Sequence, residues 1–427
     1  MKFKKILQGV LASYMISSSV FCVFAPSNTF PPYDPNVRLP KCPNMRIHLG
    51  ATAEYGQSNS ARDYTGDKHN VLNIYDKYQD AATMFKNPSD SIKEAVALEY
   101  NNMYAAFGGQ LLTAPISFEG EYRELDLTLF GKYTLKNFID GDLDLSVHLP
   151  VRWRKIENIQ FKDLSKTVLP MVPYYYQQNY TKNFDVFNAK MKELGNIDFS
   201  ECDKSGIGDL VVMLEWLRSF KQNKEALKNV DLFLRIGLSC PTAETKDLDK
   251  VFSMSLGNDG AWGMPIGFGL GLDFSNKIRA GGDVEFFILF DETKERRLKT
   301  DPDQTEFLLL NKGRATLDSG LTWKFNIFLQ AYRFYKGLSL KLDYEYIKHD
   351  DDTLYEKTDT FDRTVINTAN SLKEWNTHNL IFQVNFDFFM WQSVLTRPQL
   401  SLFYKYPITG KNIINMDTFG GQLGFNF

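Results

Sequence analysis

The stretch LDLTLFGKYTLKNFIDGDLDLSVHLPVRW, residues 125–153, decides the fold. Apolar residues occupy every second position on both sides of the short polar turn at residues 140–142. A period of two is that of a β-strand with one apolar face, and two such runs around a short turn predict a β-hairpin. The alternating positions are Leu125, Leu127, Leu129, Tyr133, Leu135, Leu143, Leu145, Val147, Leu149, Val151 and Trp153.

The same alternation recurs ten more times along the chain, giving twelve runs of about ten residues each, the length that crosses a bilayer as a tilted strand. An even strand number suits a closed antiparallel barrel of the bacterial outer membrane. The sequence therefore predicts an all-β fold, a transmembrane antiparallel β-barrel of twelve strands with helical segments in its outer loops. The further runs begin at Met45, Leu210, Val230, Trp262, Val284, Leu317, Leu338, Leu380, Leu400 and Phe419.

Short and long connections alternate between the runs, as short periplasmic turns and longer outer loops do in such barrels. The longest outer loops are expected at residues 56–120 and 155–207. In the first, residues 71–85 show helical spacing, and Ser91-Ile92-Lys93-Glu94 resembles a capping box before a second helix. In the second, residues 184–194 predict a helix that ends at Gly195. The first loop either folds inward as a plug or covers the rim as a cap.

The chain begins with a basic and then apolar segment, residues 1–25, which predicts an export signal peptide, with a lone membrane anchor as the alternative. Residues 26–44 are proline-rich and predict a periplasmic linker, so that the barrel with its loops spans residues 45–427. The expected location is the cell outer membrane. Export leaves Cys42, Cys202 and Cys240, and a Cys202–Cys240 disulfide and free thiols are both open.

Composition excludes two large classes of protein. The 427 residues are 43 % hydrophobic and 14 % aromatic, yet mean hydropathy is −0.31, which is too polar for a bundle of membrane helices. A net charge of −3 gives no basic excess for nucleic acid. A soluble exported β-sandwich remains the rival, but aromatic residues at strand ends favour a membrane barrel with interfacial girdles. These residues are Tyr55, Trp153, Trp216, Trp262, Phe274, Trp323, Tyr344, Tyr346, Tyr404 and Tyr406.

The last nine residues resemble the carboxy-terminal signal by which the outer-membrane assembly machinery recognises its barrels. They are aromatic at the final position and apolar at alternate positions before it. The resemblance implies that this machinery is a partner of the chain. The residues that carry it are Phe419, Gly421, Leu423, Phe425 and Phe427.

A second resemblance covers residues 205–274. Ser205-Gly-Ile-Gly-Asp-Leu210, then Leu234-Arg-Ile-Gly-Leu-Ser-Cys-Pro-Thr242 and the glycine-alternating run 263–274 are similar to the outer-membrane family named for the phenol-degradation meta-pathway. That family is related by fold to transporters of fatty acids and aromatic hydrocarbons. Ala243 stands where the family usually has glycine after Pro-Thr.

Successive residues of a strand point to opposite faces. If the apolar residues of each strand face lipid, the polar residues that alternate with them face the lumen. Both signs of charge are present there, so the sequence indicates no simple anion or cation filter. The lumen is either a water-filled passage or a packed, ion-paired interior. The residues expected to line it are Arg46, His48, Glu54, Asp126, Lys132, Asp144, His148, Arg152, Arg154, Arg235, Asp283, Glu285, Asp318, Lys324, Lys341, Asp343, Glu345 and Asp387.

We therefore expect a channel or transporter for the passive uptake of small solutes, with hydrophobic or aromatic compounds among the candidates. An outer-surface structural or adhesion barrel is the first alternative and an outer-membrane hydrolase the second. No histidine is followed two residues later by serine, as in the outer-membrane phospholipase, and no zinc-ligand spacing or phosphate-binding loop occurs. The sequence thus predicts no enzyme, catalytic site, metal or cofactor. Expected partners are outer-membrane lipid, the assembly machinery and a small-molecule solute, but no nucleic acid.

Overall fold

The computed structural model describes residues 46–89, 92–106, 113–168, 172–222, 224–274, 277–357, 360–388 and 397–427. The predicted export signal and linker, with Cys42 and Met45, therefore lie outside the described residues, as does Ser91 of the predicted capping box.

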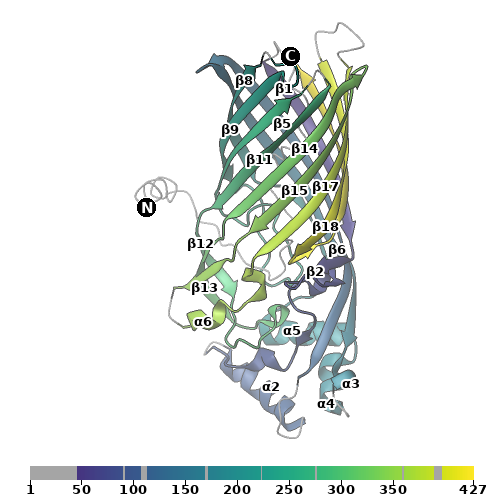
Figure 1. Ribbon diagram of the computed structural model, residues 1–427. Coiled ribbons are helices and arrows are strands. Elements are labelled where there is room, and N and C mark those ends of the chain that lie inside the picture. The colour runs from purple at the N-terminus through teal and green to yellow at the C-terminus, as the bar shows by residue number, and fades with distance from the viewer. Residues whose placement is uncertain are drawn as a thin grey trace.

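Twelve antiparallel strands close into a barrel (Figure 1). Closure is complete because β1 pairs with β20 on one side and with β5 on the other. The predicted all-β, twelve-stranded barrel is confirmed. Its strands, in order around the wall, are β1 (Ile47–Ser58), β5 (Pro115–Phe138), β6 (Gly141–Asp163), β8 (Leu210–Lys221), β9 (Asn229–Cys240), β10 (Gly263–Asp273), β11 (Ile278–Leu289), β14 (Thr322–Tyr335), β15 (Leu338–His349), β17 (Trp375–Asp387), β18 (Arg397–Lys411) and β20 (Asp417–Asn426).

The barrel exposes its apolar face and buries its polar one. On β5, Leu125, Leu127 and Leu129 are 37–45 % exposed, whereas Thr128 between them is 8 % exposed. A soluble sheet buries its apolar face, so this inverted arrangement is what a lipid environment requires. Among the helices that the described residues form, none has the length and apolar character needed to cross a membrane.

The helices and small sheets gather at the end of the barrel opposite the C-terminus (Figure 1). We call this assembly the cap. It comprises the described residues within 59–114, 164–209, 241–262, 290–321, 350–374 and 412–416, with the adjoining ends of β5 and β6. Its helices are α2 (Lys93–Ala106), α3 (Ser165–Val168), α4 (Tyr174–Tyr176), α5 (Phe184–Gly195) and α6 (Arg363–Ile366), with the short helical turns η3 (Val71–Asn73), η4 (Thr83–Phe85), η5 (Gln177–Thr181), η6 (Glu306–Leu308) and η7 (Asn370–Leu372). Its strands are β2 (Ser60–Arg62), β3 (Lys68–Asn70), β4 (Gln79–Asp80), β7 (Cys202–Ile207), β12 (Glu292–Arg297), β13 (Lys312–Asp318), β16 (Thr353–Glu356) and β19 (Ile413–Ile414).

The β5–β6 hairpin extends beyond the barrel and supports the cap. Its strands are 24 and 23 residues long, more than twice the length that crosses a bilayer. One face of their far ends packs against the cap, where Ile116, Phe118 and Ile156 are fully buried. The turn that joins them lies at Ile139 and Asp140, whose φ angles are 47° and 57°, and it stands one residue earlier than predicted because Phe138 already pairs with Gly141.

The cap has an aromatic core of its own. The Phe118 ring, from the far end of β5, stacks on Phe199 with ring centroids 4.8 Å apart. Phe187 and Phe252 also contact Phe118, and Phe307 packs edge-on against Phe252 at 5.6 Å. All five side chains are buried, so the cap segments that supply them form one packed unit. The described part of the first outer loop belongs to this unit and covers the barrel end as a cap.

Two local predictions in and beside the cap need correction. The helix expected over residues 71–85 is wrong, since only η3 and η4 form there. Between these two turns Gln79 and Asp80 pair with β5 as β4, and the Asp80 side chain accepts from the Ala82 and Ala114 amides, so the chain is extended where a continuous helix would pass.

The helix predicted from Phe184 is confirmed as α5, which ends at Gly195 as predicted; the residue that caps it in the left-handed conformation is Asn196, with a φ of 52°. The barrel strand predicted from Leu317 begins at Thr322, because Leu317 pairs with Glu292 and Leu354 in the separate β12–β13–β16 sheet. Of the two alternatives left open for Cys202 and Cys240, the structure has the free thiols.

Candidate functional site: the barrel lumen and its cap

One side of the lumen is packed with paired charges. Arg235 of β9 binds Asp283 at 2.8 Å and Glu285 at 2.9 Å, both on β11. To reach them its side chain crosses β10, where the facing residue is Gly267, and a Cβ there would collide with the guanidinium stem. The glycine alternation of β10 therefore makes room for an ion pair between the strands on either side of it.

Other bulky lumen residues also lie along the wall above a glycine. The Phe130 ring of β5 covers Gly50 of β1, and Phe287 of β11 covers Gly263, each with Cζ 2.5 Å from the position of an added Cβ. Phe233 covers Gly269 in the same way. Aromatic rings placed over strand glycines fill the gap that the missing side chain leaves. This arrangement keeps large side chains against the wall and away from the barrel axis.

Amide and hydroxyl groups extend the polar network to the strands beyond β11. Asn326 donates to Asp283 at 3.2 Å, and Asn379 donates to Glu345 at 3.0 Å. Gln383 donates to the Ser401 hydroxyl at 2.7 Å. These bonded side chains are all less than a tenth exposed, so this half of the lumen is a packed interior.

The β1–β5 side of the lumen is more open. The Lys132 side chain is 26 % exposed and that of Asp126 is 24 % exposed, although both face inward. Near the rim opposite the cap, the Phe130 ring lies between those of His48 and His148, with centroids 5.3 Å and 5.9 Å away. Inward-facing side chains with accessible surface indicate space for water beside this wall.

A buried charge cluster lies in the lumen beneath the cap. Arg154 binds Asp126 and lies 3.4 Å from Glu124, whose other contact is the Tyr122 hydroxyl, donating at 2.7 Å. Arg154 is 1 % exposed and Tyr122 is fully buried. The accessible space along β5 thus ends at Tyr122 and Arg154.

The residues expected to line the lumen fall into three groups. Arg46 is exposed and precedes β1, and Asp318 ends β13 in the cap, so the placement of Asp318 in the barrel wall is wrong because β14 begins only at Thr322. Partly exposed and inward-facing are His48, Glu54, Asp126, Lys132, His148 and Lys341. Less than a tenth exposed are Asp144, Arg152, Arg154, Arg235, Asp283, Glu285, Lys324, Asp343, Glu345 and Asp387.

Sequence reasoning missed the uncharged part of the lumen and three of its charged residues. The inward amides alternate with apolar residues as the charges do, so the same parity would have found them. The inward phenylalanines gave no such signal. An aromatic residue at a position where the alternating pattern requires a polar one only interrupts the pattern. The missed residues include Glu215, Asp231, Arg279, Asn326, Asn379, Gln383, Asn385, Ser401, Gln422, Phe130, Phe233, Phe287, Phe328 and Phe403.

The motif around Asp209 fastens part of the cap to the wall. Asp209 lies between β7 and β8, and its carboxylate accepts from the Ala243 amide at 3.1 Å and from the Asn258 amide at 2.5 Å. Thr242 accepts from the Leu210 amide at 2.9 Å and donates to the Gly208 carbonyl at 2.8 Å. These residues of the quoted motifs hold the segment 241–262 over the barrel mouth.

One hydroxyl, one imidazole and one carboxylate are linked where the barrel meets the cap. The Thr322 hydroxyl lies 2.7 Å from Nδ1 of His349, and Nε2 of His349 lies 3.0 Å from Asp352. Such an order of groups can activate a hydroxyl as a nucleophile. Here Thr322 and His349 are 5 % and 7 % exposed, so the contacts tie β14 and β15 to the cap and leave little access for a substrate.

The outer surface of the cap contains a cavity of about 630 Å³. It is lined by residues of three cap segments, including Asp63, Asp76, Asp80, Lys86 and Asn370. Within the described residues, no group of three or more His, Cys, Asp and Glu side chains is arranged to hold a metal.

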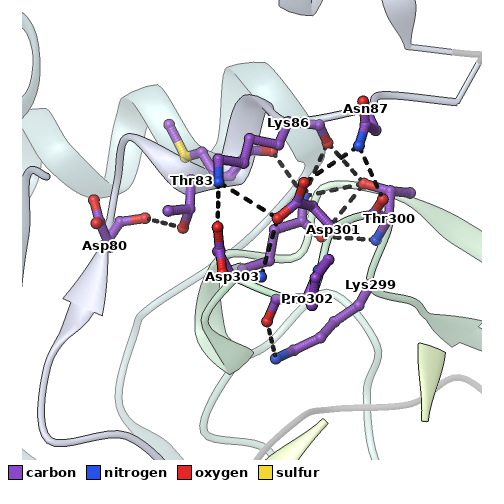
Figure 2. A network of polar contacts seen from close by, with 11 residues as sticks. Asp80, Thr83, Lys86, Asn87, Lys299, Thr300, Asp301, Pro302 and Asp303 are labelled. Atoms are coloured by element: carbon purple, nitrogen blue, oxygen red, sulfur yellow. Dashed lines mark hydrogen bonds and ion pairs between the residues drawn. The ribbon is translucent and has the colours of Figure 1, made fainter. Parts of the chain in front are cut away.

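Beside this cavity a polar network joins residues 80–87 to residues 299–303 (Figure 2). Lys86 binds Asp303 at 2.5 Å and Asp301 at 3.5 Å, while the Thr300 hydroxyl donates to the Lys86 carbonyl at 2.8 Å. The hydrogen bond from Lys86 lowers the pKa of Asp303. The network fixes two cap segments that are more than 200 residues apart in the chain.

The buried carboxylate of Glu99, on α2, is the centre of another hydrogen-bond cluster in the cap. Burial alone would raise its pKa, but hydrogen bonds from Tyr180, Tyr175 and Lys190 outweigh this effect and lower the pKa. The three donor atoms lie 2.6, 2.8 and 3.0 Å from the carboxylate. Glu99 thereby joins α2 to α4, η5 and α5.

Neither a family model nor a curated protein sequence matches the chain. Among solved structures, it is similar to an outer-membrane channel from Pseudomonas putida F1, with a TM-score of 0.52 and 11 % identity over 93 % of this chain and 100 % of that chain. This likeness establishes a shared fold and agrees with the predicted outer-membrane barrel. The finer resemblance to the phenol-degradation family stays a prediction.

Two further structures show weaker likeness. A FadL homologue of Pseudomonas aeruginosa has a TM-score of 0.31 at 9 % identity, and the toluene transporter TodX of Pseudomonas putida has 0.30 at 6 %. Each comparison covers 90 % of both chains. At these scores neither adds to the assignment of the fold.

Proposed function

We propose that the chain is an outer-membrane channel for the passive uptake of small solutes, with its cap facing the cell exterior and closed in this structure. The observation that carries the proposal is the asymmetric lumen. Charges pack the β9–β15 side, whereas Lys132 and Asp126 on the β1–β5 side keep accessible surface. A barrel that served only as a structural anchor would gain from filling both sides.

Aromatic surface inside the lumen supports apolar or aromatic solutes as the substrates. Phe130, Phe233 and Phe328 face inward and are only partly buried. They lie among polar groups that would hold water beside them, which is how binding sites combine apolar area with a few polar contacts.

The test is conductance of the purified full-length chain in planar bilayers, with a cysteine placed in the accessible wall. Thr52→Cys faces inward on β1, while its neighbour Ala53→Cys faces outward and is the matched control. A charged thiol reagent should reduce the current through T52C. The current through A53C and through the wild type, which carries the native thiols, should not change.

Liposome swelling with aromatic, fatty and sugar solutes then identifies the solute class. Because the cap is closed, both assays are repeated with Phe118→Ala, which removes the central ring of the cap core. If neither the wild type nor F118A conducts ions or admits any solute while both retain the folded barrel, the channel proposal is rejected. A structural or adhesion barrel then takes its place.

A further inference from the structure

Three cap segments that are distant in the chain meet at one buried carboxylate, Glu306. The side chain is 1 % exposed and accepts from the Asn370 amide at 2.6 Å and from the Ser371 hydroxyl at 3.0 Å. The Glu306 amide donates to Asp76 at 3.0 Å. Glu306 therefore joins the segment 290–321 to the segments 59–114 and 350–374.

A second carboxylate completes the junction. Asp76 also accepts from the Asn370 side chain at 2.9 Å, and that side chain donates to the Tyr75 carbonyl at 3.1 Å. Each of the three segments thus contacts both others. The residue after Glu306, Phe307, reaches into the aromatic core and donates its amide to Gln79 at 2.9 Å. Movement at Glu306 must therefore disturb the core of the cap.

The charges at this junction do not balance when both carboxyls are ionised. Lys299, whose Nζ lies 3.9 Å from Glu306, is the cation that acts on both carboxyls. Asn370 and Ser371 supply neutral hydrogen bonds from the third segment. The negative charges of the buried Glu306 and the partly buried Asp76 then share one positive charge, which favours a proton on one of the carboxyls.

We propose that Asp76, Lys299, Glu306, Asn370 and Ser371 form a proton-operated latch, which holds the cap shut in acid and loosens at neutral and alkaline pH. Protonation of Glu306 leaves one carboxylate opposite one lysine and removes the repulsion between Asp76 and Glu306. The neutral carboxyl still accepts from the Asn370 amide. Loss of the proton restores the unbalanced buried charge and weakens the contacts among the three segments.

The direction of the titration agrees with this arrangement. Burial raises the pKa of Glu306 from 4.5 to about 6, with Asp76 adding to the rise and Lys299 opposing it. Burial also raises the pKa of Asp76. The closed latch binds a proton more tightly than the open one, so acid favours closure. A shift of this size predicts closure about tenfold stronger at pH 5 than at pH 8.

The latch is tested by hydrogen exchange of the full-length chain in lipid nanodiscs, corrected for the intrinsic effect of pH on exchange. The probes are the amides of Glu306, Phe307 and Asn370, which are bonded across the junction. We expect their protection to fall about tenfold from pH 5 to pH 8. Equal protection at both values, or greater protection at pH 8, overturns the proposal.

Variants assign the effect to the latch carboxyls. Glu306→Gln should keep the three amides protected at both pH values, because the amide side chain carries no charge. Asp76→Asn should move the midpoint of the pH dependence below that of the wild type. Glu295→Gln removes an exposed carboxylate from the same cap segment and should behave as the wild type. A pH response that persists unchanged in E306Q and D76N contradicts the assignment.

Control of solute passage by this latch rests on the proposed channel function, and the two can fail separately. If the latch gates the channel, conductance should rise from pH 5 to pH 8 in the wild type and stay low in E306Q. Exchange that responds to pH without a change in a measurable current would retain the latch and reject its gating role. If no variant conducts any current, the channel proposal is rejected, while the hydrogen-exchange result still tests the latch.

Discussion

The ring of Phe130 covers Gly50 on the neighbouring strand, so that a Cβ added at position 50 would stand 2.5 Å from Cζ of Phe130 and 2.7 Å from the Leu423 carbonyl oxygen. The ring could rotate, but the carbonyl belongs to the pairing between β1 and β20 and cannot move without loosening it.

We therefore expect Gly50→Ala to destabilise the barrel by roughly 1–3 kcal/mol, the usual effect of overpacking. Its matched control is Gly131→Ala on the outward face, where the nearest atom to an added Cβ is 3.4 Å away. The measurement is the temperature at which the folded barrel, with its distinct mobility in cold detergent gels, converts to the unfolded form. Equal conversion temperatures for both variants would contradict the packing argument.

The ion pairs of Arg235 give a second prediction. Arg235→Ala leaves Asp283 and Glu285 buried without their shared cation, and we expect a loss of about 3–5 kcal/mol in unfolding free energy. Neutralising the acids in R235A/D283N/E285Q should recover part of this loss. The comparison is Lys162→Ala, which breaks an ion pair with Glu119 on a largely exposed surface and should change stability by less than about 1 kcal/mol. If R235A loses no more unfolding free energy than K162A does, the ion pairs in the lumen are hydrated.

Removal of the Phe118 ring should loosen the cap and leave the barrel intact. The ring is fully buried among five other phenylalanines, and Phe→Ala at such a position costs about 3–5 kcal/mol. We expect limited proteolysis to cut the cap faster while the barrel strands stay protected. Leu98→Ala, at an α2 position that is 67 % exposed, is the control. If F118A loses the barrel as well, the cap and barrel unfold as one unit.

We expect the contacts of Glu99 to weaken in acid, which is the opposite of the pH dependence proposed for Glu306. Because the hydrogen bonds from Tyr180, Tyr175 and Lys190 lower the pKa of Glu99 below 4.5, its contribution is complete above that value and is lost as the pH falls through the lowered pKa. Hydrogen exchange in α2 should accelerate below about pH 4.5 in the wild type. Glu99→Gln should be less protected at pH 7 and show no such response. An α2 helix whose protection is constant between pH 7 and pH 3.5 would contradict this role.

The twelve barrel strands were predictable because a strand with lipid on one face and a polar lumen on the other must alternate at every residue. Leu125, Leu127 and Leu129 show this pattern without any knowledge of their partners. The cap was not predictable in the same way. Its core forms from Phe118, Phe199, Phe252 and Phe307, which are distant in the chain, and no local period marks residues that meet only in the folded protein.

The alternation of polar and apolar residues predicted which charged residues face the lumen, but it did not predict which of them pair. The reach of Arg235 from β9 to β11 depends on Gly267 between them, and a glycine in a strand gives no sign of which neighbour fills its place. Asp318 was misplaced for a related reason, since alternation continues through β13 although that strand belongs to the cap sheet.

The seam between β1 and β20 sets the order in which the barrel can form. Its residues His48 and Asn426 are 378 positions apart in the chain, whereas the two strands of the β5–β6 hairpin are joined by a turn of two residues. Local hairpins close quickly and distant contacts slowly, so the seam is the last pairing to form. Until then β1 and β20 are open edges, each able to pair with a foreign strand. The predicted assembly signal covers β20 and the residue after it, Phe427, so the strand that the assembly machinery would recognise is also one that needs protection until closure.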